Sequence, residues 1–233
     1  MSHGSRNIPI IRMYHVSKQY ESKNALSDIS LEVKENEFLF VTGASGAGKT
    51  TLLKLLYFGE PATTGQVIID GVNLSRIEKE QIPILRRKFG IIFQEYKLIS
   101  TKTIIENLAL VLEVTGQKRK FIEKKVRSVL RIVGMEEKLN TFPKSLSGGE
   151  QQRIAVARAV IGDPKIILAD EPTGNLDPAS AQIIYDLLIR FHQEGATILV
   201  ATHDERLIRQ IKGRIIELEK GLLKADTPEP EIR

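Results

Sequence analysis

The sequence has no cysteine among its 233 residues. Disulfide bonds, thiolate nucleophiles and cysteine-ligated zinc sites are therefore excluded. No apolar run approaches the roughly 18 residues that a membrane-spanning helix needs. The first residues also lack the long apolar segment of a secretion signal. If a membrane is involved, these features imply that the chain reaches it through a partner.

The composition is otherwise that of an ordinary globular protein, with 42% hydrophobic residues. Basic side chains number 34 and acidic ones 29, which gives a net charge of +5. This mild excess fits a membrane surface, nucleic acid or a polyphosphate ligand, and it equally fits a solvated surface of mixed charge. The length suits one domain, or a core with a subdomain.

Hydrophobic patterning divides the chain into three parts. The first part is strand-like, and residues 38–43, FLFVTG, form a short apolar run that ends in glycine. From about 76 to 160 the pattern is helical and charged, with one apolar face made by Ile122, Val126, Val129, Leu130 and Val133. The last part alternates strand-like and helical segments. We therefore expect an α/β fold with a mostly parallel sheet, helices on both faces, and a disordered polar tail over 224–233.

Residues 43–51, GASGAGKTT, fit the phosphate-loop pattern G-x-x-x-x-G-K-[ST]. The segment follows an apolar strand-like run and precedes a helical pattern, so we favour a phosphate loop over a chance match. Backbone N–H groups and the positive end of the helix would hold phosphate oxygens. Lys49 would add charge near the β- and γ-phosphates, and the Thr50 hydroxyl could bind Mg²⁺. The predicted binding residues are Gly43, Ala44, Ser45, Gly46, Ala47, Gly48, Lys49, Thr50 and Thr51.

Polar residues end two later apolar runs. Asp170 and Glu171 close IILADE, and His203 follows ILVAT. The carboxyl ends of parallel strands are where such sheets bind ligands. Asp170 could hold Mg²⁺, Glu171 could orient and deprotonate an attacking water, and His203 could contact a γ-phosphate. The alternatives are a solvated turn for the acidic pair and a structural hydrogen bond for the histidine.

A second candidate anion site lies in LSGGE, residues 146–150. Ser147 and Glu150 match a capping box, which alone could explain them. Gly148 and Gly149, however, each lower helix propensity by about 1 kcal/mol relative to alanine. A purely structural cap would not favour them, whereas glycines let an anion approach the backbone closely. One loop with a lysine and one turn without suggest two halves of a site, joined when two copies pack head to tail.

Taken together, these motifs resemble the nucleotide-binding subunit of ABC (ATP-binding cassette) ATPases. The set is GASGAGKT, the glutamine in IIFQEY, LSGGEQQR, IILADE, GNLD at 174–177 and the histidine in ATHD. The resemblance covers about residues 10–223 and implies one α/β domain of the P-loop NTPase type. It implies a RecA-like core (about 10–92 and 161–223) with an N-terminal antiparallel β part, and a helical subdomain (about 93–160).

The resemblance also implies roles for matching residues. Tyr20 would stack on adenine, although it could instead be an aromatic of the core. Gln94 would reach Mg²⁺ and the attacking water, and Asp177 would communicate across a homodimer that sandwiches two ATP molecules. His203 would bind the γ-phosphate as a switch histidine. Mg²⁺-dependent hydrolysis would give ADP and phosphate. The residues implied to clasp ATP of the opposite protomer are Ser147, Gly148, Gly149 and Glu150, the last being glutamine in many members.

Within this family, stretches such as TGASGAGKTTLLKLL and IPILRRKFGIIFQ lean towards the cell-division ATPases. That implies an integral membrane partner that regulates peptidoglycan hydrolysis, attachment to the cytoplasmic face of the inner (plasma) membrane through this partner, and no nucleic acid. A groove near Gln94 would receive a short cytoplasmic helix of the partner. Its candidate lining residues, which could equally be helical core, are Phe93, Tyr96, Leu98 and Ile99.

Other interpretations stay open. ATPase subunits of lipoprotein-release and macrolide exporters share the phosphate motifs. A nucleotide-gated scaffold with little turnover is a third alternative. ABC-type ATPases of DNA repair or ribosomes carry coiled-coil insertions or a second cassette, and this sequence has one set of motifs and neither feature.

Overall fold

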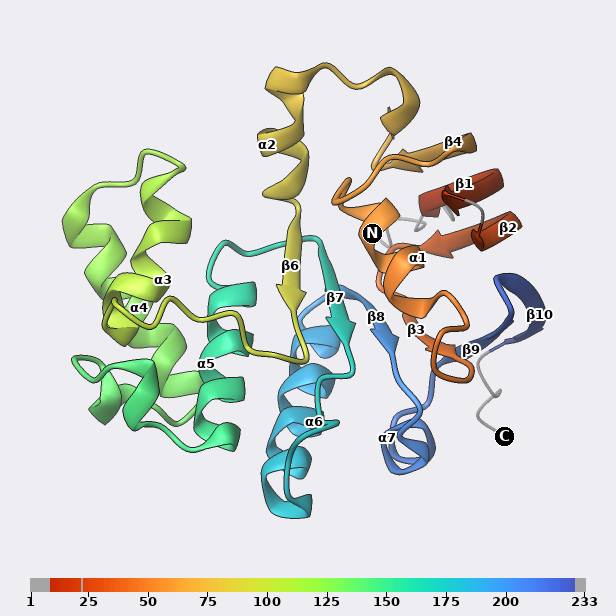
Figure 1. The fold of residues 1–233 in the computed structure, drawn as a ribbon. Coiled ribbons are helices and arrows are strands. Elements are labelled where there is room, and N and C mark those ends of the chain that lie inside the picture. Colours follow the sequence, from red (N-terminus) through yellow and green to blue (C-terminus); the bar gives the residue numbers. More distant parts are fainter. Residues whose placement is uncertain (1–8, 22, 229–233) are drawn as a thin grey trace, which may run out of the picture.

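The computed structural model of the chain describes residues 9–21 and 23–228. Within these ranges the main element is a six-stranded sheet with the order β10-β9-β3-β8-β7-β6 (Figure 1). The strands run parallel except for the edge strand β10, which is antiparallel to β9. This arrangement confirms the predicted α/β fold with a mostly parallel sheet. The bounds are β3 (Phe38–Thr42), β6 (Phe89–Ile92), β7 (Ile166–Asp170), β8 (Thr197–Ala201), β9 (Arg214–Glu219) and β10 (Leu222–Thr227).

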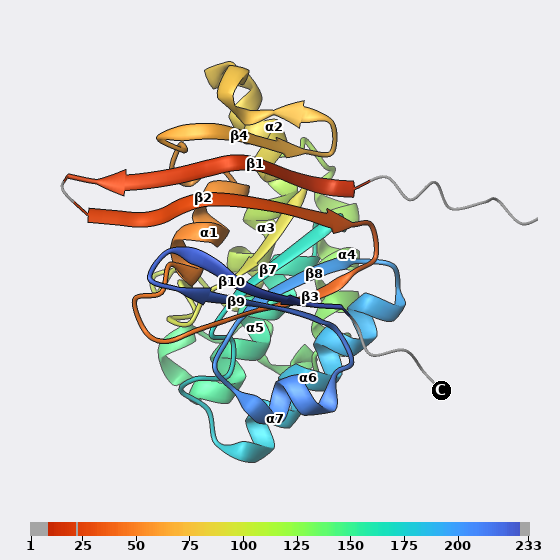
Figure 2. The same ribbon diagram turned by 90° about the vertical axis from the view of Figure 1, so that its right-hand side faces the viewer.

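The N-terminal region forms a separate antiparallel sheet, as the family resemblance implies. Its strand order in the described residues is β2-β1-β4-β5, and the long strands β1 and β2 lie side by side in Figure 2. The bounds are β1 (Pro9–Tyr20), β2 (Lys23–Lys34), β4 (Thr64–Ile69) and β5 (Val72–Asn73).

Two apolar cores lie on opposite faces of the larger sheet. Strand β3 shows why, since alternate side chains of a strand point to opposite faces. Phe38 and Phe40 pack in the core on the side of the C-terminal helices. Leu39 and Val41 pack in the other core, towards the antiparallel sheet. A run that is apolar at every position therefore buries both of its faces.

The helices follow the predicted pattern. The apolar face predicted for residues 122–134 is buried, which confirms that helix. None of the helices in the described ranges is both long and apolar enough to cross a membrane. The α-helices are α1 (Lys49–Leu56), α2 (Ile82–Arg86), α3 (Ile104–Glu113), α4 (Arg119–Ile132), α5 (Gly148–Val160), α6 (Pro178–Gln193) and α7 (Glu205–Gln210). Short 3₁₀ turns are Leu74–Arg76, Lys79–Gln81, Glu136–Lys138 and Pro143–Ser145.

Two expectations need correction. The segment from about 76 to 160, which has a helical pattern, also contains strand β6. The residues of β6 do not alternate between apolar and polar, because both faces of this strand are covered. The expected start of the disordered tail, residue 224, is too early, because β10 continues to Thr227 and pairs with β9. Residues 229–233 lie outside the described residues. Helices lie on both faces of the large sheet, as expected, and on one face α1 shares this role with the antiparallel sheet.

Candidate functional site

The predicted phosphate loop connects β3 to the first turn of α1. Three of its glycines have a positive φ: Gly43 (134°), Gly46 (77°) and Gly48 (110°). A Cβ on Gly43 would collide with the Leu218 carbonyl, and one on Gly48 would lie 2.6 Å from the Ala25 carbonyl oxygen. Glycine is therefore needed both for the backbone conformation and for close packing. The loop brings its N–H groups and the N-terminus of α1 to the same cleft.

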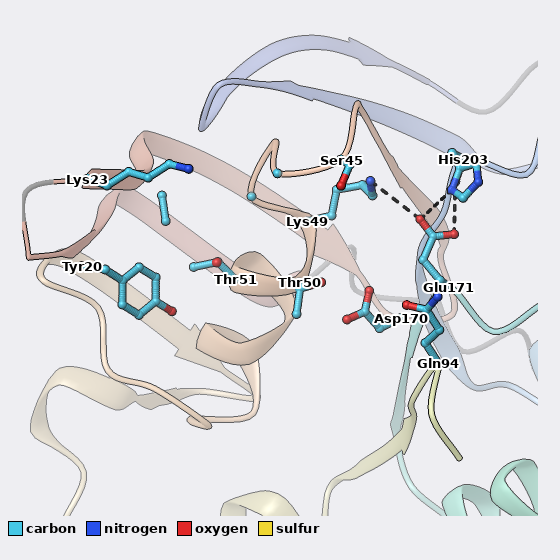
Figure 3. A pocket seen from close by; sticks show the side chains of 13 residues that line it. Tyr20, Lys23, Ser45, Lys49, Thr50, Thr51, Gln94, Asp170, Glu171 and His203 are labelled. Carbon is cyan, nitrogen blue, oxygen red and sulfur yellow. Dashed lines mark hydrogen bonds and ion pairs between the residues drawn. The ribbon is translucent and has the colours of Figure 1, made fainter. Parts of the chain in front are cut away.

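Lys49 is the first residue of α1 and is buried, with a relative exposure of 9%. Its ammonium donates hydrogen bonds to the carbonyl oxygens of Gly43 (2.8 Å) and Ala44 (3.3 Å). It also lies 3.7 Å from Oε1 of Glu171 (Figure 3). The loop therefore carries a fixed positive charge beside its own backbone donors, which suits a bound polyphosphate.

Glu171 is held in one orientation by residues at the end of β8. Its φ is +46°, a left-handed conformation that is strained for a non-glycine residue. The Thr202 hydroxyl donates to Oε2 at 3.2 Å, and Nδ1 of His203 lies 2.9 Å from Oε1. The carboxylate is thus pre-positioned between Lys49 and the histidine, whose side chain is 75% exposed.

Asp170 ends β7, next to Glu171. Burial raises the pKa of Asp170 and the neighbouring Glu171 charge raises it further, whereas the Thr50 hydroxyl and the Lys49 charge oppose the shift. Thr50, Gln94 and Asp170 line the same cleft and come from three different segments (Figure 3). The described residues contain no cluster of three or more His, Cys, Asp or Glu side chains that could hold a metal by themselves. One carboxylate with hydroxyl and amide oxygens instead fits Mg²⁺ held jointly with substrate phosphates.

Tyr20 lies at the other end of the cleft and is 39% exposed, so the alternative of a core aromatic is wrong. Its hydroxyl donates a hydrogen bond to Glu60. The Lys18 ammonium lies 4.9 Å from the centre of its ring, an arrangement that favours cation–π attraction. Hydrogen bonding from Tyr20 lowers the pKa of Glu60. Glu60 also accepts a bond from Lys54 of α1 at 3.1 Å, so it ties the tyrosine to the helix that follows the phosphate loop.

These elements enclose a cleft of about 670 Å³. The structure brings together in it most of the residues predicted to bind or hydrolyse a nucleotide, and adds Lys23 and Ala25, which sequence reasoning missed. Their position just after Tyr20 in the chain is the one signal that could have found them. The lining residues are Tyr20, Lys23, Ala25, Ser45, Gly46, Gly48, Lys49, Thr50, Thr51, Gln94, Asp170, Glu171 and His203. Gly43, Ala44 and Ala47 belong to the loop but do not line the cleft.

The second predicted anion turn lies outside this cleft. Ser147 is the exposed N-cap of α5 and forms the predicted capping box. Its hydroxyl accepts from the Glu150 N–H at 3.3 Å, and the Glu150 carboxylate accepts from the Ser147 N–H at 2.8 Å. Asp177 is the N-cap of α6, where its carboxylate accepts from the N–H groups of Ala179 and Ser180 at 3.0 Å, and it is also exposed. Neither group lines the cleft, so any contact of these residues with a nucleotide needs another copy of the chain.

The two glycines of this turn have a packing reason as well. A Cβ on Gly149 would collide with the Ser180 hydroxyl of α6, and one on Gly148 would lie 2.8 Å from the Tyr96 hydroxyl. Packing therefore explains glycine at position 149, whereas the neighbour of Gly148 is the far end of a tyrosine side chain that can move away. Gly149 permits the N-terminus of α5 to pack against α6.

The fold and the cleft are those of an ABC ATPase, and comparison with known proteins agrees. The family model described as "ABC transporter" matches residues 26–174, and the chain belongs to this family. Among curated proteins it is similar to the cell division ATP-binding protein FtsE of Streptococcus pneumoniae serotype 2, with 44% identity over 95% of this chain and 97% of the relative. It is 42% identical to FtsE of Mycobacterium tuberculosis (93% and 95%) and 41% identical to FtsE of Escherichia coli K12 (92% and 97%).

Solved structures show the same architecture. A dimeric bacterial ABC transporter cassette superposes with a TM-score of 0.89 at 34% identity, over 95% of this chain and all of that chain. A dimeric cassette in a post-hydrolysis state, bound to ADP and phosphate, gives 0.88 at 33% identity with the same coverage. The methionine import protein MetN of Photobacterium profundum is 41% identical, but only 61% of its length is matched.

Proposed function

We propose that the chain is the ATP-binding and ATP-hydrolysing subunit of an FtsEX-type ABC complex. In this complex, ATP-driven dimerisation moves a membrane partner that regulates peptidoglycan hydrolysis in cell division. The observation that carries the ATPase part is the convergence of Lys49, Glu171 and His203 at one edge of the parallel sheet, where Glu171 lies within hydrogen-bond or ion-pair distance of both other side chains. The cell-division part rests on the similarity to FtsE over nearly the full length of both chains.

In the ATP site, the phosphate loop binds the triphosphate through its N–H groups, and Lys49 supplies charge at the β- and γ-phosphates. Tyr20 provides an aromatic face for adenine. Thr50, Gln94 and Asp170 are the residues that would hold Mg²⁺. When bound, Mg²⁺ neutralises charge that develops on the phosphate oxygens.

The chemistry assigned to Glu171 follows from its geometry. Its carboxylate orients a water molecule and accepts one of its protons while the water oxygen attacks the γ-phosphorus. The bond from phosphorus to the bridging oxygen breaks, and ADP keeps that electron pair. His203 donates a hydrogen bond to the γ-phosphate. Its exposure and its contact with Glu171 let it swing between the carboxylate and the ligand.

The proposed dimer gives a role to the turn at Ser147, which does not line the ATP cleft of its own chain. Ser147, Gly148, Gly149 and Glu150 would contact the γ-phosphate of ATP bound by a second copy, and Asp177 would lie beside them at the dimer interface. Support comes from the exposure of Ser147 and Asp177 and from the dimeric state of the two similar cassettes. The capping bonds leave the turn with a fixed conformation before the second copy arrives.

The membrane partner is an FtsX-like integral membrane protein, which holds this chain at the cytoplasmic face of the inner (plasma) membrane; no nucleic acid is involved. Its docking site is a groove of about 550 Å³ beside β6, bounded by residues of α2, α3 and α5. Of the four lining residues expected from the sequence, Phe93 lines this groove. Leu98 packs on the core, so the alternative of a helical-core residue holds for it. Tyr96 lies beside Gly148.

The test is a capture experiment with the Glu171→Gln variant, which should bind ATP without hydrolysing it. The variant is immobilised with ATP and Mg²⁺ and exposed to detergent-solubilised membranes of its own cell. Retention of an FtsX-like protein supports the proposal. Retention of a lipoprotein-release or macrolide-export permease would leave the ATPase mechanism unchanged but make the chain an exporter subunit in place of a cell-division subunit. Retention of DNA or ribosomes alone would refute the membrane assignment. ATPase activity of the unmodified chain, measured with and without the partner, separates a motor from a nucleotide-gated scaffold.

A further inference from the structure

A polar cluster lies beside the turn that carries His203. Its side chains come from three segments: Asp204 follows the histidine, Thr173 follows the turn at Glu171, and Tyr185 belongs to α6. Tyr185 and Thr173 are buried, with relative exposures of 4% and 5%. None of the three lines the ATP cleft, so direct contact with the nucleotide is not their role.

The carboxylate of Asp204 is the centre of this cluster. Its Oδ2 accepts hydrogen bonds from the Tyr185 hydroxyl and from the Thr173 hydroxyl, the latter at 3.1 Å. Its Oδ1 accepts from the N–H of Arg206 at 2.9 Å and so caps α7. Both oxygens of the carboxylate are therefore bonded, and they tie the start of α7 to the middle of α6.

The protonation states suit this arrangement. Burial and the hydrogen bond to Asp204 raise the pKa of Tyr185 to about 12, so its hydroxyl keeps its proton and can donate. Burial alone would raise the pKa of Asp204, but the bonds from Tyr185 and from backbone N–H groups outweigh it and lower that pKa. A protonated donor thus faces an ionised acceptor, which makes a stronger hydrogen bond than two neutral groups do.

The cluster reaches the catalytic residues through Thr202. Its buried hydroxyl accepts from the N–H of Asp204 at 3.0 Å and donates to Oε2 of Glu171 at 3.2 Å. His203 lies between Thr202 and Asp204 in the chain, so hydrogen bonds hold both of its neighbours. Its own side chain is 75% exposed, with Nδ1 2.9 Å from Oε1 of Glu171 (Figure 3). The backbone of the histidine is therefore fixed, while its imidazole can turn.

We infer that Tyr185 is a positioning residue for His203. By holding Asp204 against α6, its hydroxyl fixes the backbone of the turn, so that only the imidazole moves between Glu171 and the γ-phosphate. A displaced turn would misplace the imidazole, and small displacements near reacting atoms are costly in rate. Thr173 holds the same carboxylate from the segment that follows Glu171. This inference rests on the proposed function, because it takes His203 to contact the γ-phosphate.

The first test observes the histidine directly and needs no ATP turnover. The full chain has four histidines, and NMR spectra of chain with isotope-labelled histidine detect them separately. His203→Ala and His192→Gln identify the signals of these two residues. Tyr185→Phe, which removes only a hydroxyl, should shift or broaden the His203 signals. His192 also lies on α6 and reports any general movement of that helix, so its signals should stay unchanged.

Two results of this test would overturn the inference. One is an unchanged set of His203 signals in Tyr185→Phe. The other is a shift of the His203 and His192 signals together, because the hydroxyl would then only hold α6 in place. Tyr14→Phe is the matched control, since on β1, outside the cleft, the Tyr14 hydroxyl also donates to a carboxylate, that of Glu32 at 3.3 Å. It should leave the His203 signals unchanged.

The second test is steady-state ATP hydrolysis. Tyr185→Phe should lower kcat about tenfold and leave the KM for ATP unchanged, because a misplaced histidine impairs the chemical step while the phosphate loop still binds ATP. Thr173→Val should lower kcat in the same way, whereas Thr173→Ser keeps the hydroxyl and should retain the activity of the unmodified chain. An unchanged kcat in Tyr185→Phe, or a change in KM alone, would contradict the inference.

A double substitution separates this inference from the proposed function. In a His203→Ala background, assayed with labelled ATP so that slow turnover is measurable, Tyr185→Phe should cause no further loss of kcat, because its effect passes through the histidine. An equal loss in both backgrounds would refute the positioning role and leave the proposed function standing. If His203→Ala hydrolyses ATP as fast as the unmodified chain, the role proposed for His203 fails, and the NMR test still decides whether Tyr185 positions the histidine.

Discussion

Ser147 has two assigned roles, and a single substitution separates them. As N-cap of α5, its hydroxyl accepts one backbone hydrogen bond. As part of a dimer, the same hydroxyl would contact ATP held by the other copy. Thr103 is a matched control, because Thr103 and Glu106 form the same reciprocal capping box at the start of α3, and neither residue lines the ATP cleft. Ser147→Ala and Thr103→Ala therefore each remove the hydroxyl of a capping box, although the Thr103 hydroxyl also donates to Glu106 at 2.7 Å.

The expected magnitudes follow from these contacts. Loss of an N-cap side chain costs about 1 kcal/mol of unfolding free energy, which corresponds to roughly 2–4 °C in Tm for a chain of this size. Ser147 is exposed, so no cavity forms to add to this cost. A hydrogen bond to a charged phosphate contributes about 1.5 kcal/mol or more. A symmetric dimer has two such turns, so Ser147→Ala should weaken dimerisation by about 3 kcal/mol, or roughly a hundredfold.

The assay uses Glu171→Gln as background, with thermal unfolding measured without nucleotide and sedimentation equilibrium measured in saturating ATP and Mg²⁺. Without nucleotide, where dimerisation does not add to Tm, both alanine variants should lower Tm by similar amounts, but only Ser147→Ala should raise the dimer dissociation constant measured with ATP. If the two variants weaken the dimer equally, or if Ser147→Ala leaves it unchanged, the serine is only a helix cap and the composite site is wrong.

Further predictions concern the cleft itself. Lys49→Ala should abolish most ATP affinity in a calorimetric titration, since its charge meets the phosphates; an unchanged affinity would remove the phosphate-loop assignment. Tyr20→Ala should lower the affinity for ATP several-fold and leave the affinity for inorganic tripolyphosphate unchanged. Glu60→Ala should lower the affinity for ATP less, because it removes the hydrogen bond that holds the tyrosine ring. Equal losses of affinity for both ligands would refute adenine stacking. Because the pKa of Asp170 is raised, its carboxylate becomes protonated at a higher pH than an ordinary aspartate, and only the ionised form binds Mg²⁺. Mg²⁺-dependent ATP affinity should therefore fall as the pH drops through that raised value. Asp170→Asn should lack this step in an affinity–pH profile, and an identical profile would contradict the assignment.

Much of the site could be predicted because its residues lie in contiguous segments. The phosphate loop, the acidic end of β7 and the capped turn before α5 each combine a motif with a recognisable strand or helix boundary. Parallel strands carry their carboxyl ends to one edge of a sheet, so the sequence alone could place Asp170 and His203 near Lys49.

Other features depend on contacts between distant segments. Glu60 is 40 residues from Tyr20 in sequence, and no local pattern connects it to that tyrosine. The close approach of Ser180 to Gly149 likewise arises only when α5 and α6 pack together. Four basic residues converge on the groove beside β6 only in the tertiary fold. They come from α2 and the residue that follows it, from the segment after β6 and from α5, and they are Arg86, Arg87, Lys97 and Arg158.

In the proposed mechanism the two halves of the ATP site belong to two copies of the chain. This is tested most directly by the mass of the Glu171→Gln chain in solution, measured by light scattering in saturating ATP with Mg²⁺ and again with ADP. We expect the mass of two chains with ATP and of one chain with ADP. A single-chain mass in both conditions, at concentrations where ATP binding is complete, would contradict the composite site.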